Sequence, residues 1–305
     1  MLSYRHNFHA GNHADILKHS TLMLLLETMV QKDKPFTVLD THGGGGIYNL
    51  ANPGLLHTGE AEKGILTFLD TVQYAELPST LENYVRLCSH YRQKNLYPGS
   101  PEIIRSMMRE KDKLFVAELH STEIEVLRDN LSTQPLLCYQ EGQLLQNKDF
   151  TPSVTIHYGN GFEMLKARVP PQIKRGIILM DPSYETDSDY REPVTTLTSA
   201  YKKWPSAIIV LWYPLLVHRK ETLHTMKAKL IENILSLNTT HSDKPILTAS
   251  LLVHGPEQDT PRLYGSEMLI VNAPYMLEEK LKITLPYVQT ILSPLKGNWH
   301  IKKYL

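Results

Sequence analysis

Short apolar runs alternate with helical segments along most of the chain and predict a parallel α/β sheet. The run at residues 177–180 is wholly apolar and contains two isoleucines, which is typical of a strand buried on both faces. Further apolar runs predict strands at residues 36–39, 113–120, 154–158, 207–212, 247–254 and 268–272. We expect the last two runs to form an edge hairpin and the helices to cover both faces of the sheet.

The first helix is predicted to begin at Asn12. Asn12 with Asp15 three positions later resembles a capping box, and an acid suits the positive end of a helix. A core-facing stripe follows at Leu22, Leu25, Leu26 and Met29. One helix turn before this stripe lies Lys18, and one turn before the stripe adjacent to it lies His19. Both side chains should therefore point toward the packed side. The alternatives are a lysine that reaches water and a histidine that is a satisfied core residue.

Residues 51–98 interrupt the alternation of strands and helices. Helical patterns occupy 61–71 and 80–94, and the second strand of the sheet follows only at 113–120. We interpret 51–98 as a small helical insertion. Residues 1–50 and 99–305 would then form the main domain. Its first 11 residues would be either a loosely held arm or a segment that folds over a site.

Composition narrows the class of protein. The 305 residues carry no net charge, so any nucleic-acid surface must be a local patch. Two cysteines, Cys88 and Cys138, are too few for a disulfide framework or a zinc cluster, which fits a cytoplasmic protein. His9 and His13 have helical spacing but no evident third ligand, so we expect no metal. The apolar segment 22–26 is far too short to cross a membrane, and the start of the chain lacks an apolar signal core.

Polar motifs follow the predicted strands at the edge where open α/β sheets bind ligands. Asp40 followed by Gly44 and Gly46 matches part of the S-adenosylmethionine loop of Rossmann-like methyltransferases, with His42 in place of its first glycine. A plain flexible turn is the alternative. Glu118 ends the second strand, where an acid commonly binds ribose hydroxyls, although a surface acid would look the same.

Three further motifs lie at the end of a predicted strand or at the start of a predicted helix. Asp181-Pro182-Ser183-Tyr184 follows the strand at 177–180 and offers hydrogen-bond acceptors beside an aromatic ring. This combination suits a planar group with an exocyclic amine, with its ring stacked on Tyr184. Ser100 is predicted as the N-cap of a helix opened by Pro101, and that helix start could face an anionic group such as a carboxylate. Asn160-Gly161 follows the strand at 154–158.

The order of these motifs resembles the RlmJ-type bacterial methyltransferases, which modify adenine N6 in 23S ribosomal RNA at adenine 2030. The resemblance runs from end to end. It is carried by Leu2-Ser3-Tyr4-Arg5-His6, the segment 8–15, Leu17-Lys18-His19, Lys34-Pro35-Phe36, Leu39-Asp40-Thr41-His42 with Gly44 and Gly46, the segment 97–101, Glu118-Leu119-His120, and Asp181-Pro182.

The resemblance implies a Rossmann-like class I methyltransferase that uses S-adenosyl-L-methionine and acts on naked or partly assembled 23S ribosomal RNA. We expect a monomer. The implied cofactor contacts are His19, His42, Gly44, Gly46, Ser100, Glu118, Asn160, Gly161 and Asp181. Asp181 would also be the catalytic acceptor, helped by Pro182, Tyr184 and Lys18. The arm with Tyr4 and His6 would order over the bound ligands.

Two positions depart from the family pattern. Ser183 replaces the second proline of Asp-Pro-Pro-Tyr, and Asn160 stands where the family usually has Asp. The amide oxygen of Asn160 is expected to accept a hydrogen bond from the adenine amine of the cofactor, without the charge. Two other functions stay open: a DNA adenine-N6 methyltransferase, and a non-catalytic RNA-binding assembly protein on the same fold. The basic tail at 296–305 is a candidate RNA contact.

Overall fold

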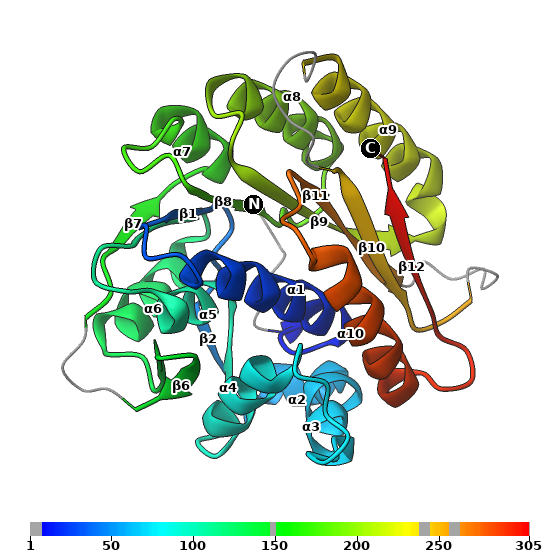
Figure 1. Ribbon diagram of the computed structural model, residues 1–305. Helices are drawn as coiled ribbons and strands as arrows, with labels where there is room; N and C mark the ends of the chain where they lie inside the picture. Colours follow the sequence, from blue (N-terminus) through cyan, green and yellow to red (C-terminus); the bar gives the residue numbers. More distant parts are fainter. Residues whose placement is uncertain (1–7, 147–150, 238–244, 256–262, 305) are drawn as a thin grey trace.

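A twisted eight-stranded sheet runs through the computed structural model, which describes residues 8–146, 151–237, 245–255 and 263–304 (Figure 1). Its strand order is β12-β10-β11-β9-β8-β1-β4-β7. The five parallel strands are β1 (Thr37–Asp40), β4 (Lys113–Glu118), β7 (Val154–Tyr158), β8 (Gly176–Met180) and β9 (Ile208–Leu216). Each of these coincides with a predicted strand, which confirms the Rossmann-like α/β class.

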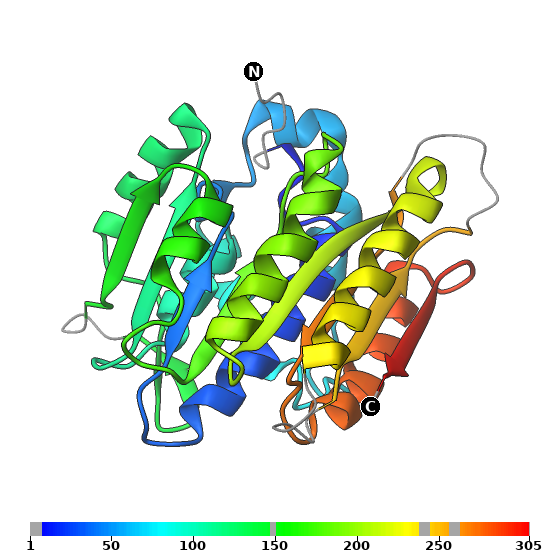
Figure 2. The same ribbon diagram turned by 90° about the horizontal axis from the view of Figure 1, so that it is seen from above.

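Helices cover both faces of the sheet (Figures 1 and 2). One layer consists of α1 (His13–Val30), α5 (Ser100–Met107), α6 (Ser121–Ser132) and α10 (Leu277–Leu292). The other layer consists of α7 (Gly161–Arg168), α8 (Ser188–Lys203) and α9 (Lys220–Leu237). Alternate residues of β8 supply the two cores: Ile177 belongs to the α1 side and Ile178 to the α8 side. This alternation explains why the strand is apolar throughout.

The end of the sheet differs from the prediction. β10 (Leu247–Leu252) and β11 (Leu263–Val271) pair antiparallel as expected, but β12 (Asn298–Lys303) pairs with β10 and forms the actual edge. The candidate RNA-contact tail is therefore largely a strand. Trp299 and Ile301 pack against the core while Lys302 and Lys303 stay exposed, and lysines on an edge strand oppose further pairing.

Helix α1 begins where the sequence predicts. The side chain of Asn12 caps it by accepting from the backbone N–H groups of Ala14 and Asp15. The return bond of a capping box is shifted by one residue, because Asp15 accepts from Gly11 N rather than from Asn12 N. Lys18 and His19 are 4% and 1% exposed, so their predicted direction is confirmed and the alternative that Lys18 reaches water is wrong.

Four short helices lie between β2 (Ile47–Asn49) and β3 (Leu96–Pro98), which pair antiparallel. They are α2 (Pro53–Thr58), the π-helix η2 (Glu62–Leu66), α3 (Thr67–Thr71) and α4 (Glu82–Arg92). Of these, η2 and α4 pack against α1 and α3 packs against α10, on the side away from the sheet (Figure 1). The interpretation of 51–98 as an insertion stays a prediction. In the described part of the chain, no helix has the length and apolarity needed to span a membrane.

Candidate active site

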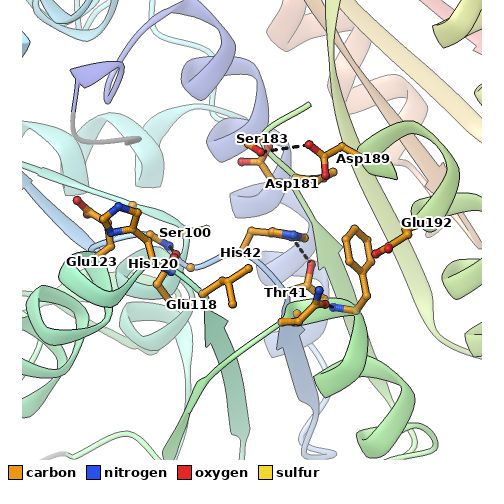
Figure 3. A pocket seen from close by; sticks show the side chains of 18 of the residues that line it. Thr41, His42, Ser100, Glu118, His120, Glu123, Asp181, Ser183, Asp189 and Glu192 are labelled. Carbon is orange, nitrogen blue, oxygen red and sulfur yellow. Dashed lines mark hydrogen bonds between the residues drawn. The ribbon is translucent and has the colours of Figure 1, made fainter. Parts of the chain in front are cut away.

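A cavity of about 330 Å³ opens at the carboxyl ends of the parallel strands (Figure 3). The chain leaves β1 toward β4 and β7 on one side and later returns to β8 and β9 on the other. Such a reversal leaves a crevice between neighbouring strand ends, and ligands of open α/β sheets bind there. Figure 3 shows Glu118 and Ser100 on one side of the cavity, Asp181 and Ser183 on the other, and His42 between them.

Most of the predicted site residues meet in this cavity. Those that line it are Lys18, His19, His42, Gly44, Ser100, Glu118, Asn160, Gly161, Asp181 and Pro182. Gly46 and Tyr184 do not line it. Tyr4 and His6 lie outside the described residues. The fold thus brings together side chains from α1, from the strand ends and from the starts of two helices.

The loop after β1 is shaped by close backbone packing. Gly43 N donates to Ala117 O at 2.8 Å, and a Cβ on Gly43 would lie 2.3 Å from a methyl carbon of Val116. Gly44 adopts a positive φ of 58° and donates its N–H to Glu118 Oε2 at 2.8 Å. The other Glu118 oxygen accepts from His120 N at 2.6 Å. Two backbone donors therefore fix the Glu118 carboxylate at the cavity wall.

Gly46 acts behind the cavity rather than inside it. It has a φ of 73°, and its carbonyl oxygen accepts from Gly99 N at 2.8 Å. This bond ties the glycine loop to the start of α5. The positive φ favours glycine at this position, since it is strained for any residue that carries a Cβ.

Ser100 does not cap its helix. The N-cap of α5 is Gly99, and Ser100 is the first helical residue, with its hydroxyl donating to Asp40 Oδ2 at 2.8 Å. Burial raises the pKa of Asp40 to about 6, although the bonds from Ser100 and His42 N oppose the change.

Asn160 caps α7 with its side-chain oxygen. Oδ1 accepts from Phe162 N at 2.8 Å and from Glu163 N at 3.3 Å. The helix start thus engages this oxygen in two hydrogen bonds, and its expected role as an acceptor from the cofactor stays a prediction. Gly161 is fixed by space, because a Cβ there would lie 1.8 Å from Thr41 O. We call Gly43, Gly44, Glu118, Asn160 and Gly161 the glycine-loop side.

Charged side chains form the opposite wall: Lys18 and Asp181 line it, and the buried Asp15 contacts Lys18 without lining the cavity. We call Asp15, Lys18 and Asp181 the ion-pair cluster. Lys18 Nζ lies 2.9 Å from Asp15 Oδ1 and also bonds Asp181 Oδ2. Burial lowers the pKa of Lys18, but the two carboxylates outweigh this effect and hold the pKa above its ordinary value. Lys18 stays protonated because loss of its proton would leave both the Asp15 and the Asp181 carboxylate without a counter-charge.

His42 lies in the cavity between its two walls. Burial, and then the nearby Lys18, lowers the pKa of His42 to about 3, so its ring is neutral at physiological pH. Its Nδ1 lies 2.8 Å from Thr41 Oγ1, and its ring meets Phe162 edge to face. His19 Nδ1 lies 2.7 Å from the Tyr97 hydroxyl.

Acidic side chains dominate the lining of the cavity. Among the described residues that line it, the carboxylates are Glu118, Glu123, Asp181, Asp189 and Glu192, and Lys18 is the one lysine or arginine. That lysine is already shared between two carboxylates. The surplus of negative charge disfavours a phosphate and favours a ligand that carries a positive centre.

The end of the Asp181-Pro182-Ser183-Tyr184 motif is held by packing. Tyr184 is 6% exposed with a φ of 56°, and its hydroxyl donates to Trp212 O at 2.8 Å. Its ring lies against those of Tyr190 and Trp212, so it is not presented to the cavity. The Ser183 hydroxyl donates to Asp189 Oδ2 at 3.3 Å, which connects the loop to the start of α8.

Several lining residues were not singled out from the sequence. Asp189 and Glu192 belong to α8, which carries no motif, and tertiary structure alone brings them to the cavity. Asp15 was noted only for capping, although its spacing of three from Lys18 could have indicated an ion pair. Among the described residues, no group of three His, Cys, Asp or Glu side chains could hold a metal ion, and the expectation of no metal stays a prediction.

Known proteins resemble this chain over nearly its whole length. A family model described as ribosomal RNA large subunit methyltransferase D, RlmJ, matches residues 33–304. Two proteins named ribosomal RNA large subunit methyltransferase J are similar to it. The one from Escherichia coli K12 is 36% identical over 96% of this chain and 95% of its own length. The one from Haemophilus influenzae is 35% identical over 99% of this chain and 98% of its own length. The crystal structure of protein LPL1258 from Legionella pneumophila superposes with a TM-score of 0.76 at 29% identity, covering 96% of this chain and 98% of that one.

Proposed function

Because this chain belongs to the RlmJ family of large-subunit ribosomal RNA methyltransferases, we propose that it methylates N6 of an adenine in 23S ribosomal RNA. The target by resemblance is adenine 2030, and the methyl donor is S-adenosylmethionine. The observation that carries the proposal is the placement of Asp181, bonded to Lys18, at the end of β8 beside an acid-lined cavity. We further propose that the enzyme works as a cytoplasmic monomer.

The glycine-loop side supports S-adenosylmethionine as the donor. The fixed Glu118 carboxylate has lone pairs left to accept from ribose hydroxyls, and Gly44 brings backbone rather than side chain to the wall. The Asn160 amide nitrogen would donate to a ring nitrogen of the cofactor's adenine. The surplus of carboxylates suits a sulfonium cation and opposes phosphate-bearing cofactors.

The ion-pair cluster supports transfer to an amine. S-adenosylmethionine supplies an electrophilic methyl group when bound. The lone pair of an adenine amine is delocalised into its ring, so the protein must favour its localisation on nitrogen. Lys18 engages Asp181 Oδ2, which leaves Oδ1 to accept one N6–H, and the Pro182 carbonyl would accept the other. Holding the amine in line with the methyl group would supply much of the rate enhancement.

The target base has to leave its stack to reach this cavity. Enzymes that act on a base flip it out or use single-stranded substrate, which favours naked or partly assembled RNA. Stacking of the base on Tyr184 would require the 181–184 loop to shift from its packed position. The N-terminal arm with Tyr4 and His6 is proposed to close over the bound ligands.

A labelled-methyl assay tests this function. Purified protein and S-adenosylmethionine are incubated with transcribed 23S ribosomal RNA, with the assembled large subunit and with duplex DNA, and the products are digested for mass spectrometry. We expect N6-methyladenosine in the naked RNA, and its loss at one position in ribosomal RNA from cells that lack the gene. Label in DNA alone would favour a DNA methyltransferase. Absence of cofactor binding by calorimetry would favour a non-catalytic assembly protein.

A further inference from the structure

We propose that Asp15 is a positioning residue that sets how strongly Lys18 engages the acceptor Asp181. This inference rests on the proposed function, since it gives Asp15 a role in the same reaction without contact to either substrate. Asp15 lies one helix turn before Lys18 on α1 and is 1% exposed. It does not line the cavity.

The two carboxylate oxygens of Asp15 have separate partners. Oδ1 lies 2.9 Å from Lys18 Nζ, and Oδ2 accepts from Gly11 N at 2.8 Å. Oδ1 also lies 3.9 Å from His19 Nε2. A carboxylate held at both oxygens cannot rotate, so the direction of the Asp15–Lys18 contact is fixed.

The anchor at Gly11 is itself clamped by the helices that follow β2. Gly11 O accepts from Ile65 N at 2.7 Å, inside the π-helix η2. A Cβ on Gly64 would lie 2.1 Å from Gly11 O, so the two segments meet backbone to backbone. Gly11 has a φ of 78°, which suits glycine at this bend. The position of Asp15 is therefore set by contacts that do not involve the cavity.

The charges around Lys18 show what Asp15 contributes. From α1 it meets Asp15, and from the end of β8 it meets Asp181. Asp40 at the end of β1 and His42 just after it lie within electrostatic reach, and β9 adds the ring of Trp212, whose centroid is 5.7 Å from Nζ. Within the described part of the chain, Asp15 and Asp181 are the carboxylates in direct contact with the ammonium.

Sharing the ammonium between two carboxylates has a chemical consequence. If Lys18 faced Asp181 alone, its full charge would fall on the group that must accept from the amine. The acceptor would then be weaker just as positive charge develops on N6. With Asp15 taking part of the interaction, Asp181 keeps more of its hydrogen-bonding strength while Lys18 stays protonated.

Asp15→Asn tests this role, with Glu27→Gln as the matched control. Glu27 is a partly buried acid on the same helix that accepts from Asn83 at 2.9 Å and lies 3.8 Å from Lys280. We expect Asp15→Asn to lower kcat about tenfold, with KM for both substrates within about twofold, since one charged contact is weakened. Its activity should also fall at alkaline pH, because loss of a carboxylate lowers the pKa of Lys18. Glu27→Gln should change neither kcat nor the pH profile.

A double-mutant cycle separates positioning from a structural role. In a Lys18→Gln background, Asp15→Asn should lower kcat no further, because the group it acts through is gone. An equal loss in both backgrounds would overturn the proposal. Asp15→Glu, which keeps the charge, should retain the alkaline activity that Asp15→Asn loses.

A readout independent of activity is the NMR titration of lysine side chains in the full-length protein. Lys18 should stay protonated throughout the alkaline range in which the wild-type fold persists, and should titrate at lower pH in Asp15→Asn. A wild-type Lys18 that titrates like the exposed lysines would overturn the inference, even if Asp15→Asn failed to fold. A wild type that methylates no RNA would instead refute the proposed function and leave the NMR comparison valid.

Discussion

The glycine-loop side and the ion-pair cluster face each other across one cavity but are built in different ways. Backbone space fixes the first, since Gly161 leaves no room for a Cβ beside Thr41 O. Charge fixes the second, since Lys18 lies between Asp15 and Asp181, and the latter is 163 residues away in sequence. The glycine-loop side should therefore be sensitive to added atoms, and the ion-pair cluster to removed charges.

The largest expected effect comes from removing the acceptor. Asp181→Ala should lower kcat by roughly a thousandfold, as loss of a preorganised polar group at the reacting centre does in other enzymes. The fold should persist, because Lys18 keeps its bond to Asp15. Single-turnover transfer of labelled methyl at saturating S-adenosylmethionine measures the rate, so that weaker binding of the cofactor does not enter it. A rate within tenfold of wild type would contradict the assignment.

An added methyl group should damage the opposite wall next most strongly. Gly161→Ala places a Cβ 1.8 Å from Thr41 O, and relief requires the ends of β1 and α7 to separate. We expect cofactor affinity to fall about a hundredfold and the melting temperature to drop, since overpacking typically costs about 1–3 kcal/mol. Calorimetry and thermal melts provide the measurement.

Gly255→Ala is the control for that substitution. A Cβ at Gly255 meets no atom within 4 Å, so both affinity and melting temperature should match wild type. Equal behaviour of the two variants would show that the close approach at Gly161 is not needed for binding.

A smaller effect is expected from pH, through Asp40. Because burial raises its pKa to about 6, Asp40 is protonated in acid and ionised above that pH. A sulfonium cation favours the ionised form, so affinity for S-adenosylmethionine should rise as pH passes upward through 6. The rise should be about tenfold for each unit by which the ligand lowers the Asp40 pKa.

Two comparisons would test the source of this pH dependence. S-adenosylhomocysteine lacks the sulfonium charge and should show a weaker trend, and Asp40→Asn should show none. Calorimetry at a series of pH values measures all three.

In the ligand-free protein, the raised pKa means that stability contributed by Asp40 is present at low pH and lost as pH rises through 6.

The smallest effect is expected at Ser183, which borders the ion-pair cluster. Its hydroxyl holds the loop through a long hydrogen bond of 3.3 Å to Asp189. A proline at this position would instead restrict the loop by fixing its own φ angle. Ser183→Pro should therefore change kcat by less than about threefold, within the weak range of a single neutral hydrogen bond. Steady-state assays decide this, and a large loss would show that the hydroxyl itself contacts the substrate.

Local patterns were sufficient for much of the fold. A strand with a uniform apolar run, such as β8, is buried on both faces whichever helices cover it. The apolar run is therefore sufficient to predict such a strand. Asn12 caps α1 through bonds to residues two and three positions away, which is also a local relation. β12 was missed because the alternation of Trp299 and Ile301 with His300 and Lys302 is short, and only its pairing with β10 makes this segment a strand.

The sequence by itself determined the order of the strand-end motifs and the inward direction of Lys18 and His19, because helix and strand periodicity fix which side of an element a residue occupies. Tertiary structure decided what those residues bond. Ser100 donates to Asp40 instead of capping α5, and Lys18 joins Asp15 to Asp181. Such pairings depend on distances between elements that are remote in sequence. Those distances are set by packing of the whole sheet and its helices, and no local pattern encodes them.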